Sequence, residues 1–146
     1  MGLFDRQIQF INEVEQAVEE EFRNAVNRFG FVMKDFIVNK QLFREGIDGQ
    51  GERLPGYKRT TIRLKIAKGD PVDRTTLRDD GDFYASIQID AFDDRFEVTS
   101  DVPYDKYILK RYGRDVLKLT EENIQEFVET YFVPNYRNFV SQQIKQ

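Results

Sequence analysis

Apolar residues recur every three or four positions through the first 29 residues of the chain. The stripe comprises Ile8, Ile11, Val14, Val18, Phe22, Ala25 and Phe29. Because an α-helix turns once in about 3.6 residues, this spacing predicts an amphipathic helix over residues 4–28. At ~1.5 Å per residue the helix is about 37 Å long, which is more than a small domain needs. We therefore expect the stripe to pack partly on its own domain and partly on something else, such as a second copy of the chain.

A second helical pattern follows a glycine. Gly30 interrupts the stripe, and Val32, Met33, Phe36 and Phe43 then resume the same spacing. The pattern predicts either a second helix or a kinked continuation of the first one over residues 31–44. Three glycines within the next seven positions predict that the helix ends there.

Residues 45–76 form a polar stretch that is rich in turn signals. Pro55-Gly56 and Gly69-Asp70-Pro71 punctuate it, and residues 60–67 have the composition of a short helix that carries Ile62 and Ile66 on one side. Irregular segments of this length are uncommon in compact domains. We expect this segment to become ordered when the protein assembles with its partners.

Strict alternation of apolar and polar residues begins at Phe83. Phe83, Ala85, Ile87, Ile89 and Ala91 share one side, which predicts a strand over residues 83–92 with one buried face. Asp93-Asp94 predicts a turn, and residues 95–100 return with Phe96 and Val98 facing inward. Nothing in the pattern suggests a crossover helix, so we expect an antiparallel hairpin.

The last third of the chain is again mostly helical by pattern. Residues 104–112 predict one or two helical turns, and Val116 and Leu117 predict a brief edge strand. Thr120, followed by two glutamates in the first turn, is predicted to be the N-cap of the closing helix. Pro134 predicts that this helix stops or kinks there.

These elements together predict an α+β fold. A long N-terminal helix and a C-terminal helix would pack on a small antiparallel sheet built around the hairpin. The length of 146 residues indicates a single domain over residues 1–146. We divide it into a helical part (1–44), a loop-rich insertion (45–76), the hairpin with short elements (77–119), and the C-terminal helix and tail (120–146).

Composition narrows the chemistry. The chain has no Cys and no His, which excludes disulfides, zinc fingers and triads or dyads that use histidine. A general base would have to be a carboxylate, a Lys or a Tyr. We find no apolar run of ~18 residues and no signal-peptide pattern, so we expect a protein made in the cytoplasm with no membrane partner.

Charge is unevenly spread along the chain, whose formal net charge is −4. Residues 53–69 hold no acidic residue and six basic ones. The basic residues are Arg53, Lys58, Arg59, Arg63, Lys65 and Lys68. Residues 70–101 hold ten acidic residues against three basic ones. The pattern indicates either a contact with a polyanion or a subunit interface between a basic and an acidic segment; the alternative is a solvated surface.

Aspartates are the remaining candidates for catalysis or metal binding. The acidic segment contains Asp79, Asp80, Asp82, Asp90, Asp93 and Asp94. Their oxygens would suit a hard cation, but the spacing is not that of an EF-hand loop. Asp and Gly also favour turns for backbone reasons, and we favour that interpretation. We therefore predict no metal and no other cofactor, and keep a carboxylate-dependent nuclease or hydrolase as an alternative.

Five short motifs, read in order, resemble those of the tail-completion and head–tail joining proteins of tailed bacteriophages, including the virion-morphogenesis and HK97 gp10-like groups. A family loop of the form D-G-x-x-W-x-P-L corresponds to residues 48–55, and T-x-x-x-K corresponds to residues 61–65. The step L-x-x-T-G-x-L-x-x-S-I corresponds to residues 77–87, and the Tyr and Gly of Y-A-x-x-x-x-x-G correspond to Tyr104 and Gly113, which lie two residues further apart than in the family. Residues 119–122 open the closing helix. The loop Trp is missing, and Asp replaces the Thr of the third motif and the Ala of the fourth.

The resemblance implies structural work with no catalytic residue. It implies a ring-forming subunit of the virion, assembled in the host cytoplasm, whose partners are further copies of itself and portal-side, connector or tail proteins. The basic segment would then face DNA without sequence specificity, or a neighbouring subunit. A cytoplasmic accessory protein that binds nucleic acid is the other alternative.

Overall fold

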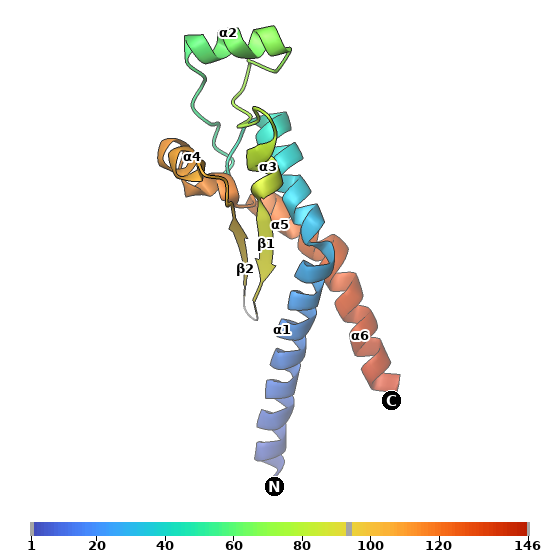
Figure 1. Cartoon of the computed structure of the whole chain (residues 1–146). Coiled ribbons are helices and arrows are strands. Elements are labelled where there is room, and N and C mark those ends of the chain that lie inside the picture. The colour runs from blue at the N-terminus through green and yellow to red at the C-terminus, as the bar shows by residue number, and fades with distance from the viewer. Residues whose placement is uncertain (1, 93–94, 146) are drawn as a thin grey trace.

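A computed structural model describes residues 2–92 and 95–145 and has an α+β fold, as the sequence predicts (Figure 1). Two long helical regions cross beside a two-stranded antiparallel sheet, and shorter helices surround the sheet. The first helical region, α1 (Leu3–Asp35), continues without interruption into the π-type helical stretch η1 (Phe36–Glu45). The second comprises α5 (Glu121–Phe127), η3 (Val128–Phe132) and α6 (Val133–Lys145).

Gly30 lies inside α1 and does not end it, so the continuation predicted from the sequence is confirmed and the separate second helix is wrong. Phe36, which follows α1, keeps helical backbone angles. A Cβ atom placed on Gly30 would lie 3.6 Å from the Cβ atom of Ile89, so the glycine marks the point where the hairpin packs on α1. The helical region ends at Gly46, whose φ of 65° is readily adopted by glycine.

The hairpin is shorter than the alternating pattern predicted. Strands β1 (Gln88–Ala91) and β2 (Phe96–Thr99) pair antiparallel, with Ile89 opposite Val98. The predicted turn residues Asp93 and Asp94 lie outside the described residues. The predicted strand over residues 83–87 is wrong, because Asp82–Ser86 forms one helical turn, α3.

The reason for this difference is that Phe83 and Tyr84 are adjacent and both buried, which a strand with one buried face does not allow. The Tyr84 hydroxyl donates a hydrogen bond to the Thr76 carbonyl, and the Ser86 hydroxyl donates to the Phe83 carbonyl at 2.7 Å. These bonds satisfy the hydroxyl groups of Tyr84 and Ser86 inside the protein. In the predicted strand both hydroxyl groups would have faced water. The alternation continues correctly in β1 and β2, whose inward residues are half-buried.

The core forms where α1 and η1 meet the hairpin and the C-terminal helices. Val26 and Met33 of α1, Ile37 and Leu42 of η1, and Phe127 of α5 are almost completely buried. Aromatic pairs join the two helical regions: the Phe29 and Tyr131 ring centroids lie 5.0 Å apart, and those of Phe22 and Phe132 lie 6.0 Å apart. Among the side chains that the structure describes, this hydrophobic cluster begins at Phe22.

The closing helix begins as predicted. The backbone N–H of Asn123 donates to the Thr120 hydroxyl at 3.2 Å, which confirms Thr120 as the capping residue. Pro134 does not stop the helix, because the preceding turns widen: the N–H of Val133 donates to the carbonyl of Val128, five residues back. The Asn135 side chain donates to the Tyr131 carbonyl at 2.5 Å, so a side chain bonds the helix backbone close to the proline.

Two short helices precede Thr120. Helix α4 (Asp105–Tyr112) confirms the predicted helical turns. The predicted edge strand at Val116 and Leu117 is wrong, because these residues belong to the 3₁₀ turn η2 (Arg114–Leu117). Both side chains are buried, whereas neighbouring strand residues point to opposite faces.

The insertion between the core and the hairpin contains more local structure than the sequence suggested. It carries helix α2 (Arg59–Lys68), which confirms the short helix expected over residues 60–67, and an isolated antiparallel bridge between Ile47 and Arg53. Figure 1 shows α2 at one end of the molecule, joined to the rest by two extended segments, and the N-terminus of α1 at the other end. None of the helices in the described part of the chain is long and apolar enough to cross a membrane.

Candidate functional site

The six basic residues of the insertion do not act as one group. We call residues 53–69 the basic arm. Arg53, Lys58, Arg59 and Arg63 are exposed, and the guanidinium of Arg53 also donates to the Asp73 carbonyl at 3.2 Å. Arg59 and Arg63 on α2, with Lys58 just before the helix, give that end of the molecule an accessible positive surface, whereas Arg53 lies at the bridge with Ile47.

Lys65 and Lys68 attach the arm to the following segment. Lys65 is only 7% exposed; its Nζ donates to the Arg78 carbonyl at 2.7 Å and lies 4.8 Å from the centroid of the Tyr57 ring. Lys68 Nζ lies 2.5 Å from Asp79 Oδ1, and this hydrogen bond and ion pair raise the pKa of Lys68. One basic residue of the arm and one residue of the acidic segment are therefore already paired within a single chain.

The remaining aspartates are spread over different elements. The backbone N–H of Asp82 donates to Asp80 Oδ1 at 2.9 Å, which lowers the pKa of Asp80. The pKa of Asp82 is raised by a hydrogen bond with the Asp80 side chain and by the negative charge of Asp80. Asp90 lies on β1 opposite Glu97 of β2, and Asp93 and Asp94 are outside the described residues. Among the described side chains, no group of three or more carboxylates has the geometry of a metal site.

A cavity of about 330 Å³ lies where the arm meets α4. Tyr57, Lys65, Leu77, Tyr104 and Ile108 contribute to its lining, together with residues 78–80. Leu77 has a φ of 59°, a backbone conformation that is uncommon for a residue with a side chain. Burial, followed by the charge of Asp80, raises the pKa of Tyr104.

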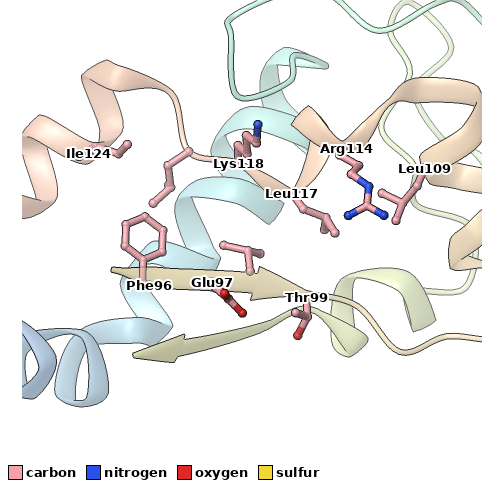
Figure 2. Close-up of a pocket in the computed structure, with 10 residues that line it drawn as sticks. Phe96, Glu97, Thr99, Leu109, Arg114, Leu117, Lys118 and Ile124 are labelled. Atoms are coloured by element: carbon pink, nitrogen blue, oxygen red, sulfur yellow. The ribbon is translucent and has the colours of Figure 1, made fainter. Parts of the chain in front are cut away.

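A larger cavity of about 540 Å³ lies along the outer edge of β2 (Figure 2). Side chains from β2, α4, η2 and the start of α5 surround it. Its lining comprises Phe96, Glu97, Val98, Thr99, Leu109, Arg114, Leu117, Lys118, Leu119 and Ile124. Leu117 of η2, where the sequence predicted a brief edge strand, is one of these lining residues. In the sheet as the structure describes it, β2 has a single partner, β1.

The chain matches no protein-family model, no curated protein and no solved structure.

The arm also exposes two apolar residues: Leu64, which the sequence pattern did not single out, and Ile66, which was expected beside Ile62 on one side of the helix. Leu64 and Ile66 of α2 are 66% and 62% exposed. A usable signal was present, because Ile62, Leu64 and Ile66 alternate inside a helix and cannot all share one buried face. The arm therefore combines exposed positive charge with exposed apolar surface, a combination that favours a binding surface over a merely solvated one.

Proposed function

We propose that the protein is a structural subunit of a tailed-phage or prophage virion, a head–tail connector or tail-completion protein that assembles into a ring. The proposal starts from the five motifs, whose shared order resembles that family. In the folded chain they fall, in order, on the loop at residues 48–55 beside the Ile47–Arg53 bridge, helix α2, the entry into the hairpin, helix α4 and the start of α5. Each motif is short, so their order along one chain is what supports the proposal.

The projecting part of α1 carries the argument for assembly. The helix is 33 residues long, and Phe22 and Phe29 are among its side chains that pack against the described hydrophobic cluster. Figure 1 shows the N-terminal half of α1 extending past the hairpin, with α6 diverging from it. The sequence places Ile8, Ile11, Val14 and Val18 on the apolar stripe of this half. A helix of this kind is stabilised when another chain covers its stripe.

The proposed role is mechanical rather than chemical. The partners would be identical copies, together with portal-side, connector or tail proteins, and the protein would reside in the virion after assembly in the host cytoplasm. No catalytic residue or cofactor belongs to this role.

Native mass spectrometry and negative-stain imaging over a concentration series test the proposal. We expect closed rings, or head-to-tail oligomers that close when a partner is added, because heterologous contacts between identical subunits form rings when the rotation closes. Expression with the remaining structural proteins of the same virus should then place the protein in assembled particles. A chain that stays monomeric at all concentrations and is missing from purified particles would overturn the proposal.

A further inference from the structure

Two oppositely charged surfaces lie at opposite ends of the molecule. The basic arm holds six basic residues and no acidic one, a formal charge of +6. Residues 3–22 of α1 hold six acidic residues and one basic one, a formal charge of −5. Figure 1 shows α2 at one end of the molecule and this part of α1 at the other, so the two surfaces cannot meet within one chain.

We propose that the basic arm of one copy docks on the acidic N-terminal half of α1 of the next copy. This inference rests on the proposed function, because it names the contact that joins neighbouring subunits. It also replaces the contact first suggested by the sequence, in which the arm meets the segment around Asp79. That aspartate is already paired with Lys68 of its own chain.

The spacing of the charges supports the contact. Arg59 and Arg63 are four residues apart on α2, and both are exposed. Glu15 and Glu19 are four residues apart on α1, and both are exposed. Side chains at this spacing lie on the same side of a helix, about 6 Å apart along its axis. The two basic side chains therefore match the two acidic ones in separation.

Apolar surface beside the charges favours a protein partner over nucleic acid. Leu64 and Ile66 are largely exposed on the arm, and an apolar stripe runs along α1 beside Glu15 and Glu19. Contacts with DNA phosphates would leave these apolar side chains in water. The N-terminal half of α1, which is acidic and carries an apolar stripe, would contact both the positive charges and the apolar side chains of the arm.

The charge of the rest of the molecule also favours a second copy. Because the net charge is −4 and the arm carries +6, the remaining residues carry −10. This charge repels a polyanion that approaches the arm, whereas it attracts the arm of another copy. The arm is also held in place before binding, since Lys65 and Lys68 attach it to Arg78 and Asp79. Less conformational freedom is then lost when the contact forms.

Charge reversal in two places tests the contact. The arm variant is Arg59→Glu with Arg63→Glu, and the helix variant is Glu15→Lys with Glu19→Lys. We expect each variant alone to associate at least about tenfold more weakly than the native chain, because each places like charges opposite one another. An equimolar mixture of the two should recover association, since every contact then pairs opposite charges again. Analytical ultracentrifugation at low and at physiological salt measures both effects, and salt should weaken the native contact.

The matched control is Lys106→Glu with Lys110→Glu on α4. These two lysines are exposed and are four residues apart, like Arg59 and Arg63. Their replacement by Glu changes the net charge by the same amount as the arm variant does. We expect it to leave association unchanged, and circular dichroism should show that all variants keep the native fold.

The failures of the two proposals are distinguishable. If the native chain forms oligomers that neither variant weakens, or if mixing brings no recovery, this inference is overturned while the ring-forming role stands. If the arm variant loses affinity for duplex DNA and keeps its self-association, the arm faces nucleic acid and the inference is likewise wrong. A native chain that never associates overturns both proposals.

Discussion

Gln41 connects η1 to the beginning of the closing helix through one buried amide group. Its Nε2 donates to the Lys118 carbonyl at 2.9 Å, while Oε1 accepts from the Thr120 N–H at 3.0 Å and from Asn123 Nδ2 at 2.8 Å. The side chain is fully buried. Water cannot replace any of these hydrogen bonds, so three polar groups depend on this one residue.

Replacing Gln41 with Ala should therefore lower the free energy of unfolding by about 2–4 kcal/mol, because buried polar groups are left without partners. Urea unfolding followed by circular dichroism measures the change. Gln125→Ala is the matched control: Gln125 is exposed and donates to Glu129 of η3, which is also exposed, so its loss should cost less than about 0.5 kcal/mol. Equal losses in the two variants would contradict the role of Gln41.

Tyr84 makes stability depend on pH in the alkaline range. Burial raises the pKa of its hydroxyl above the ordinary value of 10.0, and the hydroxyl donates to the Thr76 carbonyl. Above about pH 10 the unfolded chain releases this proton while the folded chain retains it. The contribution of the protonated hydroxyl to the free energy of unfolding is therefore complete below pH 10. It is lost as pH rises above 10, by at most about 1.4 kcal/mol per pH unit.

We expect Tyr84→Phe to be less stable than the native protein by about 1–2 kcal/mol at pH 8, since the Thr76 carbonyl loses its donor. This difference should narrow as pH rises above 10, because the variant has no proton to lose at that position. Urea unfolding at several pH values measures the difference. Tyr107→Phe, at a side chain that is 76% exposed, should show neither the loss nor the narrowing. A constant difference between pH 8 and pH 11 would refute the assignment.

At the scale of the elements, Gly30 in α1 and Gly49 in the loop after η1 have different roles. A Cβ atom on Gly30 would meet Ile89 at ordinary contact distance, whereas one on Gly49 would lie 2.4 Å from the Lys118 Cβ atom and 2.6 Å from its carbonyl oxygen. The N–H of Gly49 also donates to the Asp115 carbonyl at 2.7 Å. Gly49 is therefore required for a close approach of two backbone segments, and Gly30 is not.

Gly30→Ala should raise the free energy of unfolding by about 0.5–1 kcal/mol, because alanine favours the helix and its methyl group fits against Ile89. Gly49→Ala should lower it by about 1–3 kcal/mol, because the added methyl group overlaps the Lys118 backbone. Thermal and urea unfolding of both variants measure whether the free energy of unfolding rises in the first variant and falls in the second. If both changes destabilise equally, the packing of the hairpin on α1 has been described wrongly.

Lys65 is the buried one of the two lysines that attach the arm to the following segment. The Lys65 ammonium group is the hydrogen-bond donor to the Arg78 carbonyl, so Lys65→Met should weaken the attachment of the arm by about 1.5–3 kcal/mol. Amide hydrogen exchange should accelerate in α2 while the rest of the molecule keeps its protection. Thr60→Ala, at an exposed position of the same helix, is the control and should leave exchange unchanged. Unchanged exchange in both variants would show that other contacts hold the arm.

At the scale of the whole molecule, folding and assembly are expected to use different parts of α1. A chain that lacks residues 2–16 keeps every member of the described hydrophobic cluster. We expect its free energy of unfolding to change by less than about 1 kcal/mol, while its self-association is lost together with Glu15. Urea unfolding and light scattering on the same samples separate the two effects. A large loss of stability would mean that the stripe is covered within the single chain.

The sequence determined the elements that have a local signal in the chain, such as a periodic apolar stripe or a capping residue. The period of the apolar stripe gave the long helix, Thr120 gave the start of the closing helix, and alternation gave the centre of the hairpin. These signals succeed because they reflect backbone geometry and local hydrogen bonds, which depend on neighbours in the chain. The α+β class follows from the same signals.

Only the tertiary structure decided how far each element extends and which charges remain available. The helical turn at Phe83 and Tyr84 displaces the predicted strand because both residues fill the core, and η2 buries Val116 and Leu117 for the same reason. Lys65 turns inward within a uniformly basic segment because the Arg78 carbonyl, which needs a donor, lies beside it. The burial of a side chain and its hydrogen-bond partners depend on residues that are far away in the sequence. A local pattern of apolar and polar residues does not show which distant residues will become neighbours.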